Sequence, residues 1–418
     1  FKAIIEIIYF TIVSDIWNYF YFENEILWER LFINNLIFIL LATLTSKLNR
    51  NRRSDFLLLI LFIFVIIPLI IYHTYNESNN YWDLFVYLSQ YLFLLLFNSY
   101  FPPIKILGKK VKQSNSYLLI AIPIIFIPFI ILIVSGGLSN WNLNPELVYE
   151  YRDSYSSKAV LTGKISYLTF WGLIVGLNYY LLVGIISRRY FLITSILFTY
   201  LIWYGTTGHK SFLLYPFFSI LIFLTYRKKS SRLLLVSGLS ALCLVLLVVD
   251  NIFLETPLLT SNFTRRVFFI PANVSFKYID FFSNNPYIWW SNSVLGVLID
   301  YNYTMPASNL IGNFMGDIKM VANNGYMSTG FMHGGLIGII LYNLIVLFIL
   351  RIIDYTPKYQ KSKMDSLFRI SIITLPMFQL FTSADLFTTL LTHGLALALL
   401  TITLYPIKFK KNEHLGFL

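Results

Sequence analysis

Long apolar runs separated by short polar segments dominate the chain. A helix that crosses a bilayer needs about 17–25 mainly apolar residues, and by this measure the pattern predicts twelve spans. They cover residues 1–22, 31–47, 55–75, 83–104, 116–135, 164–186, 190–205, 211–226, 233–253, 330–352, 367–384 and 387–406. The short runs 190–205 and 211–226 are also compatible with one broken hairpin that does not fully cross. The pattern therefore predicts an all-α integral membrane protein, with residues 1–418 in one polytopic domain.

Composition agrees with a membrane protein and excludes an ordinary soluble one. Only 12% of the residues are charged and 57% are hydrophobic, whereas soluble domains carry about 25% charged residues. The net charge of +12 indicates loop charge in such a chain, so no nucleic-acid partner is expected. The single cysteine, Cys243, cannot form an intramolecular disulfide. We expect the first apolar segment to act as an uncleaved insertion signal.

The distribution of lysine and arginine predicts the orientation. In a twelve-span count, 23 of the 32 basic residues fall on one side, which is expected to be the cytoplasm. Besides Lys2 and Arg369, they lie in the loops 47–53, 105–113, 187–189, 227–232, 351–363 and 408–411. Both termini are therefore predicted to be cytoplasmic. The nine basic residues on the outer side are Arg30, Arg152, Lys158, Lys164, Lys210, Arg265, Arg266, Lys277 and Lys319.

Two outer segments are long, a medium loop over residues 136–163 and a large loop, or cap, over residues 254–329. The large loop is rich in aromatic residues, and residues 272–283 fit a short amphipathic helix. Asn273, Lys277 and Asp280 share one face of that helix. The aromatic side chains suit a membrane interface, and we expect Trp289 and Trp290 there.

The chemistry available to the chain is limited. The five histidines and one cysteine show no metal-ligand spacing, and the sequence carries no nucleotide-binding loop and no serine-hydrolase elbow. We expect no metal and no cofactor. What remains is a set of outward-facing cations, and arginine offers a planar fork that suits phosphate oxygens. Such cations could bind a lipid diphosphate and stabilise it as a leaving group.

Four elements carry these residues. The first is Arg152, followed by ten residues and Gly163; the second is "TTGHKS" (206–211), with His209 and Lys210. The third is "RRVFFIPANVSFKYIDFF" (265–282), with Arg265, Arg266 and Lys277, and the fourth is "VANNGYMSTGFMHGGLIGI" (321–339), with Asn324 and His333. Each has a structural alternative: a snorkelling lysine, a surface helix at lipid headgroups, glycines for helix packing, or a polar cap formed by a lone histidine.

Together, in this order and on one predicted side, these elements resemble the Wzy-type O-antigen or capsular oligosaccharide repeat-unit polymerases. The resemblance covers about residues 145–340 and rests on Val148–Arg152, Gly208–Ser211, Arg266–Phe281 and Ala322–Gly338. The chain departs from the family pattern in three places. A second Arg-x10-Gly is absent, because the count from Arg266 ends at Lys277. Thr329 stands where many relatives carry an acid, and His333 where an Asn or another polar residue is common.

The resemblance implies a glycosyltransferase with an undecaprenyl-diphosphate-linked oligosaccharide donor. It implies a multi-pass protein of the bacterial inner membrane whose active site faces the periplasm, with a flippase and a chain-length regulator as partners. Expected catalytic residues are Arg152, Arg266 and His333, with Asp317 and Asp280 as alternative bases. Expected substrate-binding residues are Tyr151, His209, Lys210, Arg265, Lys277 and Asn324.

Two other functions compete with the polymerase. An O-antigen ligase has a similar number of spans and a large outer loop, and it differs in its acceptor, the lipid A core. A lipid-linked oligosaccharide flippase should have short loops and basic residues inside its spans. The spans here are nearly free of lysine and arginine, and the outer segment 254–329 is large. The sequence separates the polymerase from the ligase poorly, and it favours both over the flippase.

Overall fold

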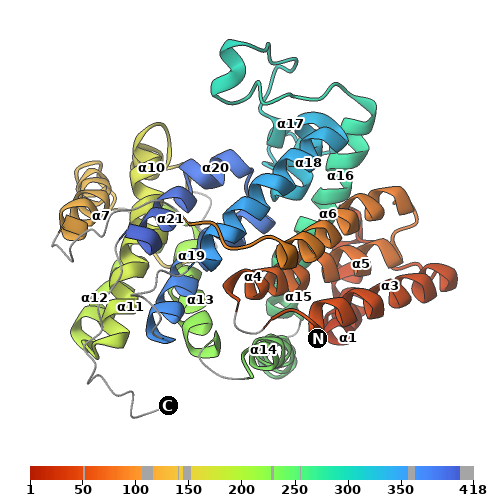
Figure 1. The fold of residues 1–418 in the computed structure, drawn as a ribbon, viewed down its shortest axis with the longest axis horizontal. Coiled ribbons are helices and arrows are strands. Elements are labelled where there is room, and N and C mark those ends of the chain that lie inside the picture. Colours follow the sequence, from red (N-terminus) through yellow and green to blue (C-terminus); the bar gives the residue numbers. More distant parts are fainter. Residues whose placement is uncertain are drawn as a thin grey trace. The chain divides into compact units, whose positions relative to one another are not determined.

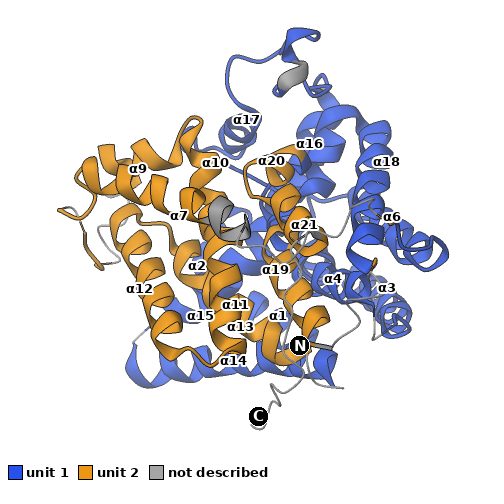
Figure 2. Ribbon diagram, turned by 60° about the vertical axis from the view of Figure 1, so that its left-hand side comes forward, with its two compact units in different colours: residues 1–104, 230–354, 378–386 blue, residues 105–229, 355–377, 387–418 orange. Residues whose placement is uncertain are grey.

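A computed structural model describes residues 1–49, 52–105, 116–139, 141–144, 152–226, 230–254, 256–355 and 363–404. Over these residues the chain is helical and contains no strand (Figure 1). It divides into two compact units, coloured separately in Figure 2. Unit 1 comprises Phe1–Ile104, Ser230–Asp354 and Phe378–Leu386, and unit 2 comprises Lys105–Lys229, Tyr355–Met377 and Phe387–Leu418.

Unit 1 contains the N-terminal helices and the long segment around α18. Its elements are α1 (Lys2–Ile8), η1 (Tyr9–Val13), α2 (Ser14–Trp17), η2 (Asn18–Phe20), α3 (Trp28–Ser46), α4 (Arg53–Leu61), η3 (Phe62–Ile66), α5 (Ile67–Tyr75), α6 (Tyr81–Tyr100), α14 (Ser231–Phe253), α15 (Leu258–Thr264), η6 (Arg265–Phe269), α16 (Ile270–Asn284), η7 (Val294–Val297), α17 (Ala307–Phe314) and α18 (Tyr326–Asp354).

Unit 2 contains the central part of the sequence and the C-terminal helix. Its elements are α7 (Ser116–Val134), α9 (Tyr155–Leu161), α10 (Ile165–Phe170), η5 (Trp171–Leu177), α11 (Asn178–Ile186), α12 (Tyr190–Thr207), α13 (Lys210–Tyr226) and α21 (Leu395–Leu404). Two helices contribute to both units, α19 (Lys363–Thr382) and α20 (Leu386–Leu391).

Eight helices of the described chain are long and apolar enough to cross a membrane. They are Lys2–Phe20, Trp28–Ser46, Arg53–Tyr75, Ile165–Ile186, Tyr190–Thr207, Ser231–Phe253, Tyr326–Asp354 and Met364–Thr382. Each coincides with an expected span, which is consistent with an integral membrane protein. The expected spans 83–104, 116–135 and 211–226 are also helices, but they fall outside these eight. The total of twelve spans and the cytoplasmic termini stay predictions.

The last expected span, 387–406, is not one helix in the structure. It is divided into α20 and α21 by a turn at Gly394, whose φ is +75°. A positive φ is readily adopted by glycine and is incompatible with a right-handed helix. Hydropathy alone could not show this interruption, because both flanking segments are apolar.

The centre of unit 1 is the continuous helix α4–η3–α5, which is buried from Arg53 to Tyr75. A helix that is apolar on all sides is expected at the centre of a bundle. Its π-helical turn η3 precedes Pro68, and the turn η6 precedes Pro271 in the same way. Proline has no N–H, so the carbonyl four residues earlier loses its partner and the helix widens locally.

The first part of the 254–329 segment lies in the core of unit 1. Residues 258–284 form one continuous helix, α15–η6–α16, and α16 packs against α5, α6 and α18. The ring of Phe276 lies 5.6 Å from Tyr72 and 6.2 Å from Tyr87. The expected helix over residues 272–283 is present. Asn273, on its polar face, is buried within the protein, and its side chain donates to the carbonyl of Phe20 at 2.9 Å.

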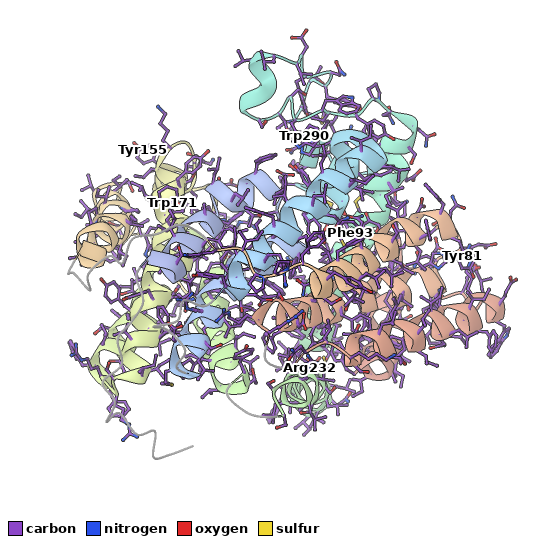
Figure 3. The ribbon with its side chains drawn as sticks, in the orientation of Figure 1. Tyr81, Phe93, Tyr155, Trp171, Arg232 and Trp290 are labelled. Atoms are coloured by element: carbon purple, nitrogen blue, oxygen red, sulfur yellow. The ribbon has the colours of Figure 1, made fainter. Side chains whose placement is uncertain are left out.

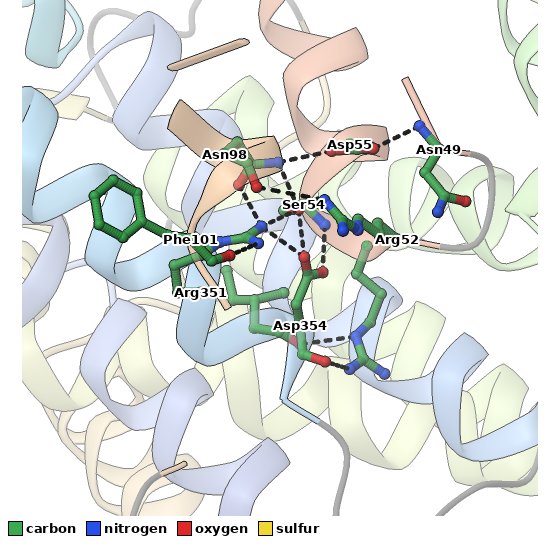
Figure 4. A network of polar contacts seen from close by, with 10 residues as sticks. Asn49, Arg52, Ser54, Asp55, Asn98, Phe101, Arg351 and Asp354 are labelled. Carbon is green, nitrogen blue, oxygen red and sulfur yellow. Dashed lines mark hydrogen bonds and ion pairs between the residues drawn. The ribbon is translucent and has the colours of Figure 1, made fainter. Parts of the chain in front are cut away.

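Several charges that the sequence places in cytoplasmic loops are buried in unit 1. Figure 4 shows Arg351 at the end of α18, where its guanidinium donates to Ser54 Oγ at 2.7 Å and to Asp354 Oδ2 at 2.6 Å. The same guanidinium also contacts the Asn98 side chain. Arg351 is 1% exposed. Because buried charges need partners, this cluster ties the ends of α4, α6 and α18 together.

Other basic residues follow the same pattern. Arg53 donates to the carbonyls of Ile353 and Asp354 at 2.8 and 2.9 Å. Lys2 is buried and lies 2.7 Å from Glu6. In unit 2, Arg369 lies 2.7 Å from Asp365, and both are buried. The 23 basic residues assigned to the cytoplasmic side therefore include several that are buried and that bind other parts of the protein.

Candidate functional site

A break in α18 lies at a buried polar cluster that includes the expected site residue His333. Gly335 has φ +56° and ψ −132°, so the helical hydrogen-bond ladder stops after His333. A Cβ atom on Gly338 would lie 2.0 Å from the carbonyl oxygen of Gly330. Residues 326–333 therefore fold closely against the rest of α18. The rings of His333 and Tyr342 are 5.7 Å apart, although nine residues of straight helix span about 13.5 Å.

Both ring nitrogens of His333 are engaged inside the protein. Its Nδ1 atom accepts a hydrogen bond from the backbone N–H of Trp290 at 3.1 Å, and Nε2 lies 3.3 Å from Asp385 Oδ1. A backbone N–H can only donate, which places the proton of a neutral imidazole on Nε2, facing Asp385. The imidazole is 1% exposed and stacks on the Trp290 ring, 5.2 Å away and 11° from parallel.

Asp385 connects this histidine to a second pair of polar side chains. It lies between α19 and α20, and its Oδ1 atom also accepts a hydrogen bond from the Tyr342 hydroxyl at 2.8 Å. The indole Nε1 of Trp290 donates to the Tyr342 oxygen at 3.0 Å. Burial by itself would raise the pKa of Asp385, but its contacts with His333, Tyr342 and Thr329 hold the pKa below its usual value. The carboxylate is therefore ionised near neutral pH.

The loop before the cluster is held in an unusual conformation. Trp289 and Trp290 have φ values of 49° and 61°, and such left-handed geometry costs about 1–3 kcal/mol for a non-glycine residue. The backbone N–H groups of Ile288 and Trp289 donate to the carbonyls of Met332 and His333 at 3.1 and 2.9 Å. These bonds offset the strain and fix Trp290 beside α18 (Figure 3). The expectation that Trp290 lies at a membrane interface stays a prediction.

Asn324 occupies a structural position next to the start of α18. Its side-chain nitrogen donates to Ser275 Oγ at 2.8 Å and Ser328 Oγ at 3.0 Å, and its oxygen accepts from the Gly325 N–H at 2.8 Å. The residue is 3% exposed. These contacts join α16 to the start of α18, and this role was not expected for Asn324.

The expected cations of unit 1 lie along α15–η6–α16. Arg265 is buried, with its guanidinium 3.6 Å from the centre of the Trp17 ring, whereas the neighbouring Arg266 is exposed. Lys277 lies 4.7 Å from the Tyr21 ring centre and 4.0 Å from Asp280. Arg266 is therefore the member of this group that is most accessible to a ligand. Asp280 and Asp317, the alternative bases, are exposed, and within the described residues neither forms a hydrogen bond or ion pair with the His333 cluster.

Arg152, His209 and Lys210 belong to unit 2, and Tyr151 lies outside the described residues. Arg152 and Lys210 are exposed. The His209 ring stacks on Phe212 at 5.3 Å, and its Nδ1 lies 3.0 Å from the Thr207 carbonyl oxygen. Burial lowers the pKa of His209, and the charge of Arg152 lowers it further. Arg152 and His209 are thus close enough to interact within unit 2.

Sequence reasoning identified His333 but missed its partners. Tyr342 stands within an expected span, where nine residues separate it from His333 and a straight helix would keep the two apart. Asp385 gave a better signal, since it is an acid in the two-residue turn between the expected spans 367–384 and 387–406. That turn is predicted to lie on the same outer side as His333.

Comparisons with models of known families, with curated proteins and with solved structures found no match for this chain.

Proposed function

We propose that this protein is a membrane glycosyltransferase that polymerises undecaprenyl-diphosphate-linked oligosaccharide repeat units. In this proposal it acts in the inner membrane of a bacterium, at the periplasmic face. A flippase supplies the repeat units and a chain-length regulator limits the product. The growing glycan leaves its lipid diphosphate and is joined to a hydroxyl of the next repeat unit.

The observation that carries the proposal is the His333–Asp385 pair at the break in α18. Ionisable side chains in a largely apolar helical protein are costly to bury, and a functional role is the default hypothesis for them. The two groups are 3.3 Å apart, and a hydrogen-bonded imidazole and carboxylate can accept and hold a proton. Deprotonation of a sugar hydroxyl needs such an acid–base group.

The cations of unit 1 supply the second requirement, a site for a diphosphate. Arg266 is exposed at the turn η6, on the continuous helix that packs against α18 through α16. Its guanidinium can bind phosphate oxygens with two parallel hydrogen bonds. A cation there would stabilise the negative charge that develops on the leaving diphosphate. Arg152 and Lys210 belong to unit 2, and their proposed role in binding phosphate rests on the sequence alone.

Deletion of the gene in its host tests the proposal. The surface glycan of the deletion strain should show a single capped repeat unit on a gel, and the wild-type gene should restore the ladder. Arg152→Ala, Arg266→Ala and His333→Ala should each weaken the ladder at equal membrane expression. Lys319→Ala removes another exposed cation of the same segment and should leave the ladder unchanged.

Other results would exclude a polymerase. If the deletion strain lacks all surface glycan while lipid-linked polymer accumulates, the protein is a ligase that transfers finished chains to the lipid A core. If neither the polymer nor the single unit reaches the outer face, the protein exports lipid-linked units.

A further inference from the structure

We infer that Asp385 is the catalytic base of the proposed transfer reaction and that His333 is a positioning residue. The inference rests on the proposed function and names the group that takes the proton. It reverses the expectation from sequence, in which His333 carries this role.

The geometry of His333 argues against direct contact with a substrate. A general base must come within about 2.6–3.2 Å of the oxygen that loses its proton. Nδ1 already accepts the Trp290 N–H, and Nε2 faces Asp385. One face of the ring is covered by the Trp290 indole, and the side chain is 1% exposed. Access to either nitrogen would require the loop at Trp289 and Trp290 to leave its hydrogen bonds with α18.

Asp385 is the more accessible member of the pair. Its side chain is 18% exposed, and it lies in the short segment between α19 and α20. Tyr342 and His333 both direct polar hydrogens at Oδ1, so they fix the orientation of the carboxylate. A carboxylate is a sufficient base for this chemistry, because inverting glycosidases also use one to deprotonate the attacking oxygen.

The transfer step balances with this assignment. The acceptor hydroxyl oxygen forms a bond to the anomeric carbon of the donor glycan, and its proton passes to Asp385. The bond between that anomeric carbon and the diphosphate oxygen breaks. Its electron pair leaves with undecaprenyl diphosphate, which departs as an anion. Asp385 then returns its proton to solvent.

A comparison of two nearly isosteric variants tests the assignment. Asp385→Asn and His333→Gln each replace one member of the pair with an amide side chain of similar size, so a purely structural role of the pair predicts similar losses. A base role predicts a loss of about 10²–10⁴-fold for Asp385→Asn and a much smaller loss for His333→Gln. Asp385→Glu should retain part of the activity, and Asp300→Asn changes an exposed acid as the matched control.

The assay uses the full chain, purified and reconstituted, with lipid-linked repeat units extracted from the deletion strain. The initial rate of polymer formation is measured across pH. The titratable groups that interact with Asp385 include His333 and Tyr342 from α18 and Tyr278 from α16. His333 helps to lower the pKa of Asp385, so His333→Gln should raise this pKa. As the solution is acidified, the rate of the variant should therefore begin to fall at a higher pH than the rate of the wild-type protein.

Each outcome has one meaning. If wild-type protein forms no polymer, the proposed function fails. If wild type polymerises and Asp385→Asn keeps its rate, or loses no more than His333→Gln, the assignment of Asp385 is overturned and the function stands. Equal thermal stability of the two variants shows that their difference is chemical. If Asp385→Asn does not fold, Asp385→Ser, which also lacks a carboxylate, takes its place in the comparison.

Discussion

Trp290 donates two hydrogen bonds toward α18, and through them it connects His333 to Tyr342. Its backbone N–H reaches His333 Nδ1 at 3.1 Å, and its indole N–H reaches the Tyr342 oxygen at 3.0 Å. The two residues that accept these hydrogen bonds, His333 and Tyr342, both lie close to Oδ1 of Asp385. The polar cluster is thus closed by a residue from the loop before α17, and its geometry depends on that loop.

Tyr342→Phe should show how much the hydrogen bond from Tyr342 to Asp385 contributes to stability and to polymer formation. The variant removes the donor to Asp385 Oδ1 and leaves the Trp290 indole N–H without its acceptor. An unsatisfied buried group costs about 1–3 kcal/mol, so the melting temperature should fall. We expect polymer formation to fall by roughly tenfold, the effect of about 1.4 kcal/mol on a barrier. Tyr190→Phe changes an exposed tyrosine and should alter neither quantity; equal effects in both variants would contradict the prediction.

Gly335→Ala should destabilise the protein through the break in α18. Alanine is strained at φ +56°, and its Cβ atom would lie 2.7 Å from the Tyr287 hydroxyl. We expect a loss of about 1–3 kcal/mol in the free energy of unfolding, measured by denaturation in detergent. The matched variant is Gly238→Ala in α14, where no atom lies within 4 Å of the added methyl group. It should be neutral or stabilising, since alanine favours helix more than glycine does.

Arg351→Ala should be among the most damaging substitutions outside the candidate site. It leaves Asp354 buried without its guanidinium partner, and breaking a buried ion pair costs about 3–5 kcal/mol. The yield of folded protein in membranes and its melting temperature should both drop. Lys158→Ala breaks the pair with Asp153, in which both side chains are largely exposed, and should have little effect. Similar stability of the two variants would show that the Arg351 cluster is not a structural anchor.

Cysteine labelling tests the predicted orientation. In a Cys243→Ala background, cysteines are placed at the exposed positions Lys319 and Arg189. A thiol reagent that cannot cross the inner membrane should label Lys319→Cys in intact cells and Arg189→Cys only after lysis. The reverse pattern would place the His333 cluster on the cytoplasmic side, and the proposed periplasmic reaction would then be wrong.

Hydropathy predicted where most helices lie, because a long apolar run has few alternatives in a bilayer. It could not predict that Gly335 interrupts α18, since an apolar run with glycines is also typical of close helix packing. The contacts of Tyr342 and Asp385 with His333 depend on that interruption and on a distant segment. The same limit applies to Arg351, whose position after an apolar run is equally typical of a solvated loop charge.

The two ends of α18 are held by different polar contacts. At its C-terminal end, the ion pair of Arg351 and Asp354 joins it to Ser54 of α4 and Asn98 of α6 (Figure 4). At the other end, His333 precedes two glycines that lack regular helical geometry. If substrate entry displaces the His333 turn, the rotation has to be absorbed at Gly334 and Gly335, because the membrane-length part of the helix is anchored. The glycine pair would then act as a pivot, so that the turn bearing His333 could swing while the rest of α18 stays in place.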